Sequence, residues 1–197
     1  MEYPLMEKFY TLQGEGAYSG SAAYFIRLAG CDVGCVWCDV KDSWEAAKYP
    51  KMQIKEIIAE VPEQCTIVVI TGGEPAMYDL TELCAALKAE GKRVHLETSG
   101  AYKIVGNIDW LCVSPKKFKA PLIENLNNAD ELKVVVFNKS DLKWAIENAV
   151  NTKHNCKYYL QPEWSVEDKM IPIIIDFVKE TAKWQVSLQS HKYLKIP

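Results

Sequence analysis

The chemistry of this chain is concentrated in three closely spaced cysteines. Cys31, Cys35 and Cys38 follow a C-x3-C-x2-C spacing, and cysteine thiolates are the ligands that iron–sulfur clusters take. A cubane cluster normally uses four thiolates, so a set of three leaves one iron open for a small molecule. The alternatives are a zinc site or a chance spacing in a cysteine-rich chain. Zinc motifs bring a second Cys or His pair at fixed spacing, and none follows here.

Length and composition indicate one globular domain, residues 1–197. Hydrophobic residues make up 49% of the chain and charged residues 25%, which is ordinary for a globular protein. A net charge of −3 argues against a dominant nucleic-acid footprint. No apolar run approaches the roughly 20 residues of a membrane span, and residues 1–12 lack the apolar region of a signal peptide. We expect a cytoplasmic protein without nucleic-acid or membrane partners, whose seven cysteines serve metal binding or catalysis rather than disulfides.

Strand-like runs alternate with helical patterns, which is typical of an α/β fold with a mainly parallel sheet. We expect strands at 22–28, 66–71, 93–97, 110–113, 131–137, 158–160 and 185–188. Helices are expected at 54–61, from a capping box of Asp79 and Glu82 to Gly91, and from Ser140 to about residue 150. A last helix begins at Ser165 or only near Pro172, because proline restricts where a regular helix continues.

The number of strands favours an incomplete barrel. A complete eightfold barrel needs roughly 250 residues, so we predict a partial TIM-like barrel of about six mainly parallel core strands. In such folds function lies at the carboxyl ends of the strands. The segments rich in cysteine, glycine and polar residues follow strands in this way, at 31–38, 72–75, 97–100 and 114–116, with Glu163 after a later strand.

Two motifs together resemble those of the radical S-adenosylmethionine (SAM) superfamily. One is the cysteine motif, with Trp37 just before its last cysteine; the other is Gly72-Gly73-Glu74-Pro75 after a strand. Glycines let the backbone approach a ligand closely, and a carboxylate is a suitable partner for an ammonium. The resemblance implies that the cysteines hold a [4Fe-4S] cluster whose open iron takes the amino and carboxylate groups of SAM.

Nearly the whole chain also resembles, in order, the 7-carboxy-7-deazaguanine synthase family. The resemblance rests on 9–16 (FYTLQGEG), Arg27, 97–100 (ETSG), 114–116 (SPK), 161–162 (QP) and 191–197 (HKYLKIP). It implies conversion of 6-carboxy-5,6,7,8-tetrahydropterin to 7-carboxy-7-deazaguanine with loss of ammonia, in 7-deazapurine (queuosine) biosynthesis. A 5′-deoxyadenosyl radical would take hydrogen from C6, and SAM would be re-formed. The resemblance further implies a homodimer and a flavodoxin- or ferredoxin-type electron donor.

The resemblance assigns side chains to both ligands. It places at SAM the residues Trp37, Thr71, Gly72, Gly73, Glu74, Ser99, Ser114, Lys116 and Gln161. It places at the pterin Leu12, Gln13, Gly14, Glu15, Gly16, Arg27, Thr98, His191 and Pro197, the last through its carboxylate. The guanidine-like edge of a pterin wants carboxylate and amide partners, and its carboxylate wants a bidentate arginine. No side chain is assigned the catalytic step, because the cofactors carry the radical chemistry.

Several alternatives stay open at the level of sequence. Residues 13–16 also fit a polar turn, Lys116 fits a solvated turn, and 191–197 fits a frayed tail. The protein could be a radical SAM activase acting on a partner protein, which would not need Gln13, Glu15 and Arg27. A non-catalytic metal-binding module is a further alternative, but it leaves the glycine motif at the strand end unexplained.

Val40 departs from the family pattern. Members commonly carry Cys-Asp-Thr at the end of the cluster loop, where the threonine hydroxyl helps to bind a Mg²⁺ that touches substrate; here the run is Cys38-Asp39-Val40. Either Mg²⁺ is held through substrate and water, since it keeps several waters, or Asp42 or Ser43 contributes to an altered site. We expect a weaker dependence on Mg²⁺ than in threonine-containing relatives.

Overall fold

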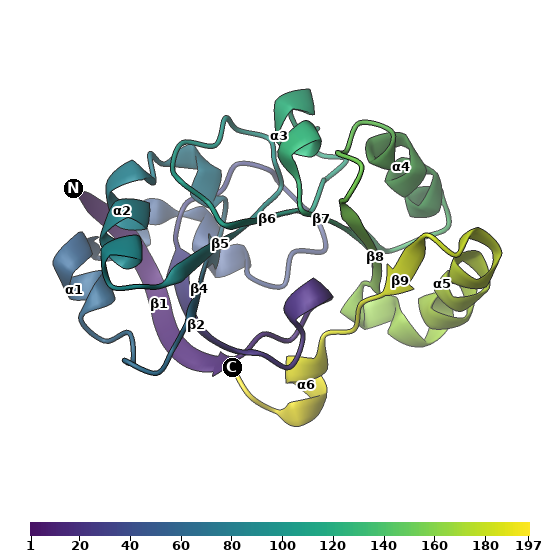
Figure 1. Ribbon diagram of the computed structural model, residues 1–197. Coiled ribbons are helices and arrows are strands. Elements are labelled where there is room, and N and C mark those ends of the chain that lie inside the picture. Colours follow the sequence, from purple (N-terminus) through teal and green to yellow (C-terminus); the bar gives the residue numbers. More distant parts are fainter.

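A curved sheet of nine strands runs through the computed structural model, which describes residues 1–197 (Figure 1). The strand order is β3-β1-β2-β4-β5-β6-β7-β8-β9. All neighbours from β2 to β9 are parallel, whereas β1 is antiparallel to both β2 and β3. The strands are β1 (Glu2–Leu12), β2 (Ala22–Leu28), β3 (Lys51–Gln53), β4 (Ile67–Gly72), β5 (Arg93–Thr98), β6 (Trp110–Val113), β7 (Glu131–Val136), β8 (Lys157–Pro162) and β9 (Trp184–Val186).

Helices cover the outer face of the curve, and a last short helix lies at its opening (Figure 1). The outer helices are α1 (Ile54–Ile58), α2 (Thr81–Ala89), α3 (Ile123–Asn128), α4 (Ser140–Ala149) and α5 (Glu167–Thr181). The helix at the opening, α6 (Ser190–Leu194), is tied to the segment after β1 because the Ser190 N–H donates to the Gly14 carbonyl at 3.0 Å. None of these helices combines the length and apolar character needed to span a membrane.

The alternation of side chains along the parallel strands gives the sheet a dry outer face and an inner face that is apolar around Phe25, Ile67 and Val69 and polar toward the carboxyl ends of the strands. Val68 and Ile70 of β4 and Leu132 of β7 belong to the main core of 29 buried side chains under the outer helices. Successive strand residues point to opposite faces, so Thr71 and Lys133 face inward. The curve therefore presents polar groups to its interior while apolar burial stabilises it from outside.

β1 is the longest of the elements that the sequence did not predict; the others are β3, α3 and α6. Its stretch carries Pro4, Glu7 and Lys8, and it lacks the unbroken β-branched run or clean alternation by which a strand is recognised. The pairing with β2 also shifts register between Leu5 and Glu7. The strand forms because the antiparallel partners on both sides, β2 and β3, satisfy its backbone.

Two details of helix boundaries correct the predictions. The expected capping box is wrong: Asp79 Oδ1 accepts the Thr81 N–H at 2.8 Å, but Glu82 pairs instead with the N-terminal ammonium of Met1 at 3.3 Å. The last long helix, α5, begins at Glu167 and contains Pro172 in its interior. It therefore starts between the two positions that the sequence left open.

Candidate active site

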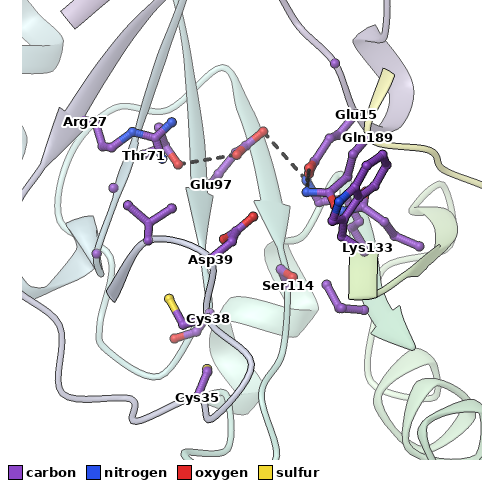
Figure 2. A pocket seen from close by; sticks show the side chains of 18 of the residues that line it. Glu15, Arg27, Cys35, Cys38, Asp39, Thr71, Glu97, Ser114, Lys133 and Gln189 are labelled. Atoms are coloured by element: carbon purple, nitrogen blue, oxygen red, sulfur yellow. Dashed lines mark hydrogen bonds and ion pairs between the residues drawn. The ribbon is translucent and has the colours of Figure 1, made fainter. Parts of the chain in front are cut away.

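A cavity of about 280 Å³ opens on the inner face of the sheet, around the carboxyl ends of the parallel strands. Its wall is built from the loop after β1, the cysteine loop after β2, the ends of β4 to β8, and the segment around α6. All of the predicted site residues line it except Gly16 and Glu74. Figure 2 shows the thiols at one end of this space and a group of polar side chains at another.

Backbone hydrogen bonds join the two ends of the cysteine loop and fix its shape. The Gly30 N–H donates to the Ser43 carbonyl at 2.6 Å, the Cys31 N–H donates to the Trp44 carbonyl at 3.2 Å, and Gly34 takes a φ of +77° that favours glycine. All three predicted cysteine ligands line the cavity. No three Cys, His, Asp or Glu side chains surround a single metal position. This donor set fits a cubane cluster, because its irons lie at separate corners and take one thiolate each.

The state of the thiols fits the same interpretation. Burial raises the pKa of Cys35 to about 11, and burial also raises the pKa of Cys31. Thiols in this environment are protonated at neutral pH, and metal coordination is what deprotonates a thiol outright. Cys31 and Cys35 are therefore neutral thiols that bound iron would convert to thiolates.

Gly72 and Gly73 press directly against the cysteine loop. The Gly73 N–H donates to the Leu28 carbonyl at 2.9 Å, and the Glu74 N–H donates to the Gly30 carbonyl at 2.8 Å. A Cβ on Gly73 would overlap the Gly30 carbonyl and approach the Cys31 Cβ to 3.0 Å. The two motifs are thus packed into one unit, with bare backbone facing the cavity.

Glu74 lies behind the cavity wall, not in it. Its carboxylate belongs to a residue that is only 1% exposed. It accepts from the Ala76 N–H at 3.0 Å, from the Ser99 N–H at 2.8 Å, and from the hydroxyls of Thr98 and Ser99. In this arrangement the structure does not bring the carboxylate to the cavity, where the resemblance gave it a contact with the SAM ammonium. Glu74 instead ties the loop after β4 to the loop after β5.

Gly16 also lies outside the cavity wall. It takes a φ of +63°, its N–H donates to Ser187 Oγ at 2.9 Å, and a Cβ would overlap the carboxylate of Glu131. Its neighbour Gly14 does line the cavity, and a Cβ there would overlap the His191 ring. The two glycines therefore allow the segment after β1 to pass close to the sheet and to α6.

Lys116 is part of the wall and not of a solvated turn. Its ammonium donates to the Ser114 carbonyl at 2.7 Å and to Ser114 Oγ at 2.5 Å, and it lies 5.7 Å from the centre of the Trp37 ring. Burial lowers the pKa of Lys116, with the nearby Cys35 opposing that shift. Gln161, on β8, is buried, and its Oε1 accepts from Ser187 Oγ at 2.9 Å.

The polar end of the cavity is a connected network (Figure 2). Gln13 Nε2 donates to Glu97 Oε1 at 2.9 Å, and the Thr71 hydroxyl lies 3.4 Å from Glu97 Oε2. Glu15 accepts from Gln189 Nε2 at 3.0 Å and forms an ion pair with Lys133 of β7. This lysine and Gln189 were not predicted as site residues, and Glu97 was recognised only as part of its motif.

Arg27, on β2, lies beside Thr71 of the neighbouring strand β4, on the side of the cavity opposite Glu15 and Gln189 (Figure 2). Its Nε is 2.6 Å from Glu7 Oε1, and its guanidinium is 5.9 Å from the centre of the Phe9 ring. The ion pair uses Nε, and the terminal nitrogens of the guanidinium make no hydrogen bond within the chain. An arginine presented in this way suits the carboxylate of a ligand.

The end of the chain is tied down over the cavity. Lys192 Nζ lies 3.4 Å from Asp39 Oδ2, which joins α6 to the cysteine loop, and Thr11 Oγ1 lies 3.5 Å from the Pro197 carbonyl oxygen. His191 and Pro197 both line the cavity, and burial lowers the pKa of His191. This segment is therefore part of the wall and not a frayed tail.

The loop around Val40 offers no hydroxyl to the cavity. Val40 lines it, but neither Asp42 nor Ser43 does. The Ser43 hydroxyl is buried and donates to the Val40 carbonyl at 2.6 Å. Asp39 does reach the cavity, and Figure 2 shows its carboxylate between the thiols and Glu97. The alternative in which Asp42 or Ser43 replaces the threonine is therefore not supported.

The open parallel sheet, the three thiols and the glycine motif packed against them define a radical SAM protein, and the Radical SAM superfamily model matches residues 25–109. Within that superfamily the chain belongs to the 7-carboxy-7-deazaguanine synthase family. It is 52% identical to the 7-carboxy-7-deazaguanine synthase of Flavobacterium psychrophilum, over 98% of this chain and 92% of the relative. It is 44% identical to that of Synechocystis, over 100% of this chain and 94% of the relative.

A solved structure supports the same assignment. The crystal structure of QueE from Escherichia coli matches with a TM-score of 0.87 and 32% identity, over 97% of this chain and 95% of that one. The predicted family, the partial-barrel fold class and the prediction of an enzyme are thereby confirmed. The family implies a [4Fe-4S] cluster and SAM as cofactors.

Proposed function

We propose that this enzyme converts 6-carboxy-5,6,7,8-tetrahydropterin to 7-carboxy-7-deazaguanine with loss of ammonia, in 7-deazapurine (queuosine) biosynthesis. The observation that carries the proposal is one cavity with three thiols at one end and a carboxylate–amide network facing an arginine at the other. The thiol end suits the cofactors. The network and the arginine suit the two ends of a carboxylated pterin.

Cys31, Cys35 and Cys38 would hold the [4Fe-4S] cluster, and SAM would lie beside it. When bound, the cluster and SAM supply the one-electron chemistry that takes a hydrogen atom from C6 and returns SAM at the end of the cycle. The chain contributes the walls of that site: the bare backbone of Gly72 and Gly73, and the side chains of Trp37, Thr71, Ser99, Ser114, Lys116 and Gln161.

The pterin would lie between the network and Arg27. Glu15 and Gln13 offer the carboxylate and amide that a guanidine-like edge requires, and Arg27 offers terminal N–H groups to the ligand carboxylate. The remaining wall at this end is formed by Leu12, Gly14, Thr98, His191 and Pro197. These residues orient the substrate and exclude water, and the protein supplies binding and orientation to chemistry that the cofactors carry.

We further propose that any Mg²⁺ in this enzyme is held through substrate and water. Val40 offers no oxygen, and neither Asp42 nor Ser43 lines the cavity. Mg²⁺ accepts such a site because it keeps several waters and needs few protein ligands.

The proposed cellular compartment, oligomeric state and electron donor follow from the same assignment. All seven cysteines are free, which suits a cytoplasmic enzyme that works in a reducing compartment. We propose that residues 1–197 form a single radical SAM domain that acts as a homodimer. Its electrons would come from a flavodoxin- or ferredoxin-type donor, since the reaction needs one-electron reduction of the cluster.

The experiment that tests the function is anaerobic turnover. The cluster is reconstituted, SAM, Mg²⁺, a strong reductant and the free tetrahydropterin are added, and products are followed by mass spectrometry. We expect 7-carboxy-7-deazaguanine and ammonia, with loss of both in a Cys38→Ala variant. SAM cleavage without any deazaguanine would reject this substrate, and activity that requires a partner protein would favour an activase.

A further inference from the structure

A buried lysine lies between two carboxylates at the polar end of the cavity. Lys133, on β7, has a side chain that is 5% exposed, and its ammonium forms an ion pair with Glu15. The same ammonium is 3.9 Å from Glu97 Oε1. Figure 2 shows the three side chains facing one another, with Gln189 beside Glu15. The proposed reaction gives this lysine no role.

The charges of this group depend on one another. Two carboxylates and one ammonium share a buried space, so removal of the ammonium would leave two negative charges without a counter-ion. A buried pair of like charges forces at least one member to take up a proton. Gln13 and Gln189 donate to the two carboxylates, but neutral amides cannot replace the lost charge.

Other titratable groups also face this lysine from the surrounding elements. They are Glu131 on β7, Cys112 on β6, Lys116 after β6 and His191 on α6. Burial opposes the charge of Lys133, but Glu15 and the other carboxylates outweigh it and raise the lysine pKa well above its ordinary value. Burial would raise the pKa of Glu15, yet Lys133 outweighs it and lowers that pKa to about 2.

We propose that Lys133 is a positioning residue that keeps Glu15 ionised and directed into the cavity, and thereby sets the ligand edge that the cavity selects. An ionised, fixed carboxylate accepts two parallel N–H bonds, as the aminopyrimidinone edge of a pterin offers. A dioxo ring presents a carbonyl oxygen where the pterin has its amino group, and this oxygen would face the carboxylate without a proton between them. Such mismatches of buried polar groups are what a site discriminates most strongly.

This inference rests on the proposed function, and its test uses ligands that do not react. The holoenzyme with SAM is titrated with 6-carboxypterin, which has no hydrogen at C6, and with 6-carboxylumazine, its dioxo counterpart. Affinities are measured between pH 5.5 and 7.5 for the wild type, Lys133→Met and the charge-preserving control Lys133→Arg. Each pH profile is measured again with the His191→Gln substitution added to the wild type and to each Lys133 variant, because His191 is a titratable group of the same cavity.

Lys133→Met is expected to bind 6-carboxypterin about 10- to 100-fold more weakly, the factor that follows from losing one hydrogen bond to a charged group. Its affinity should fall further as the pH decreases, because Glu15 then takes up a proton, and its preference over 6-carboxylumazine should shrink. Lys133→Arg should keep both the preference and the flat profile. A Lys133→Met enzyme with unchanged affinity, preference and pH profile would overturn the inference.

Two outcomes separate this inference from its basis. If Lys133→Met does not fold, the His191→Gln enzyme with Lys133 intact still tests the inference. Its binding should be independent of pH over this range, and a fall in binding toward pH 5.5 would overturn the role given to Lys133. A wild-type holoenzyme that binds no 6-carboxypterin at all would instead overturn the proposed function.

Discussion

Glu74 gives the sharpest test of how the site is built, because the structure places its carboxylate behind the cavity wall. Replacement by glutamine keeps the size of the side chain but converts one accepting oxygen into an N–H donor. The carboxylate has four donors around it, two on each oxygen. The amide therefore turns its NH₂ toward either Ala76 N–H and Thr98 or the N–H and hydroxyl of Ser99.

The magnitude follows from those contacts. A hydroxyl can rotate and accept from the new NH₂, but a backbone N–H cannot, so at least one buried donor loses its partner. Hydrogen bonds to a charged group contribute about 1.5–3 kcal/mol each, so we expect Glu74→Gln to lower the free energy of unfolding by roughly 2–4 kcal/mol. Thr98→Val keeps the carboxylate but removes a hydroxyl that donates to it and accepts from the Gly100 N–H, so it is the matched control and should cost a similar amount.

The assay pairs chemical denaturation with a SAM titration of the reconstituted enzyme at a denaturant concentration where both proteins are folded. We expect a loss of stability and a change in the SAM dissociation constant of less than about 3-fold, because the carboxylate does not line the cavity. A Glu74→Gln enzyme of wild-type stability with SAM affinity weakened more than about 10-fold would refute this reasoning. In that case the carboxylate would bind the ligand itself.

Three further perturbations test other parts of the site. Gly73→Ala should abolish cluster retention, measured as iron bound per chain, because the added Cβ overlaps the Gly30 carbonyl; a full iron content would contradict this. Val40→Thr should increase the rate loss on removal of Mg²⁺, and equal losses in both enzymes would show that the hydroxyl is irrelevant. Glu15 has a pKa of about 2 in the fold against an ordinary value of 4.5, so its ionised form stabilises the protein at neutral pH and this contribution disappears as the pH falls between those values. Glu15→Gln should therefore flatten stability against pH in that range, and an unchanged denaturation profile would count against the ion pair.

The sequence predicted the parallel part of the fold well. Trp110–Val113 is a strand with the expected bounds, and the β-branched run at Ile67–Gly72 lies within one residue of its predicted position. Such strands are covered on both faces, so their apolar runs are visible in one sequence. Glu2–Leu12 has no such run, because its antiparallel pairing leaves several side chains partly exposed. Its existence depends on partners that are remote in the chain.

The site residues likewise divide into those in local motifs, which the sequence predicts, and those that meet only through the fold. The cysteine and glycine motifs are local, so their positions at the ends of β2 and β4 could be predicted from spacing and strand order. Lys133 and Gln189 could not, because they meet Glu15 across 118 and 174 positions of the chain. The available signal for Lys133 was a charged residue inside the apolar run of β7, in the same way that Arg27 is a charged residue inside the apolar run of β2. The direction of the Glu74 carboxylate, away from the cavity, leaves no trace in the motif itself.

The central claim is that this cavity holds a carboxylated tetrahydropterin with C6 presented to SAM. The most direct measurement uses substrate carrying deuterium at C6 and follows the isotope by mass spectrometry during anaerobic turnover. The account predicts that deuterium leaves C6 and appears in the recovered SAM as 7-carboxy-7-deazaguanine accumulates. Product that forms while SAM remains free of deuterium would contradict it.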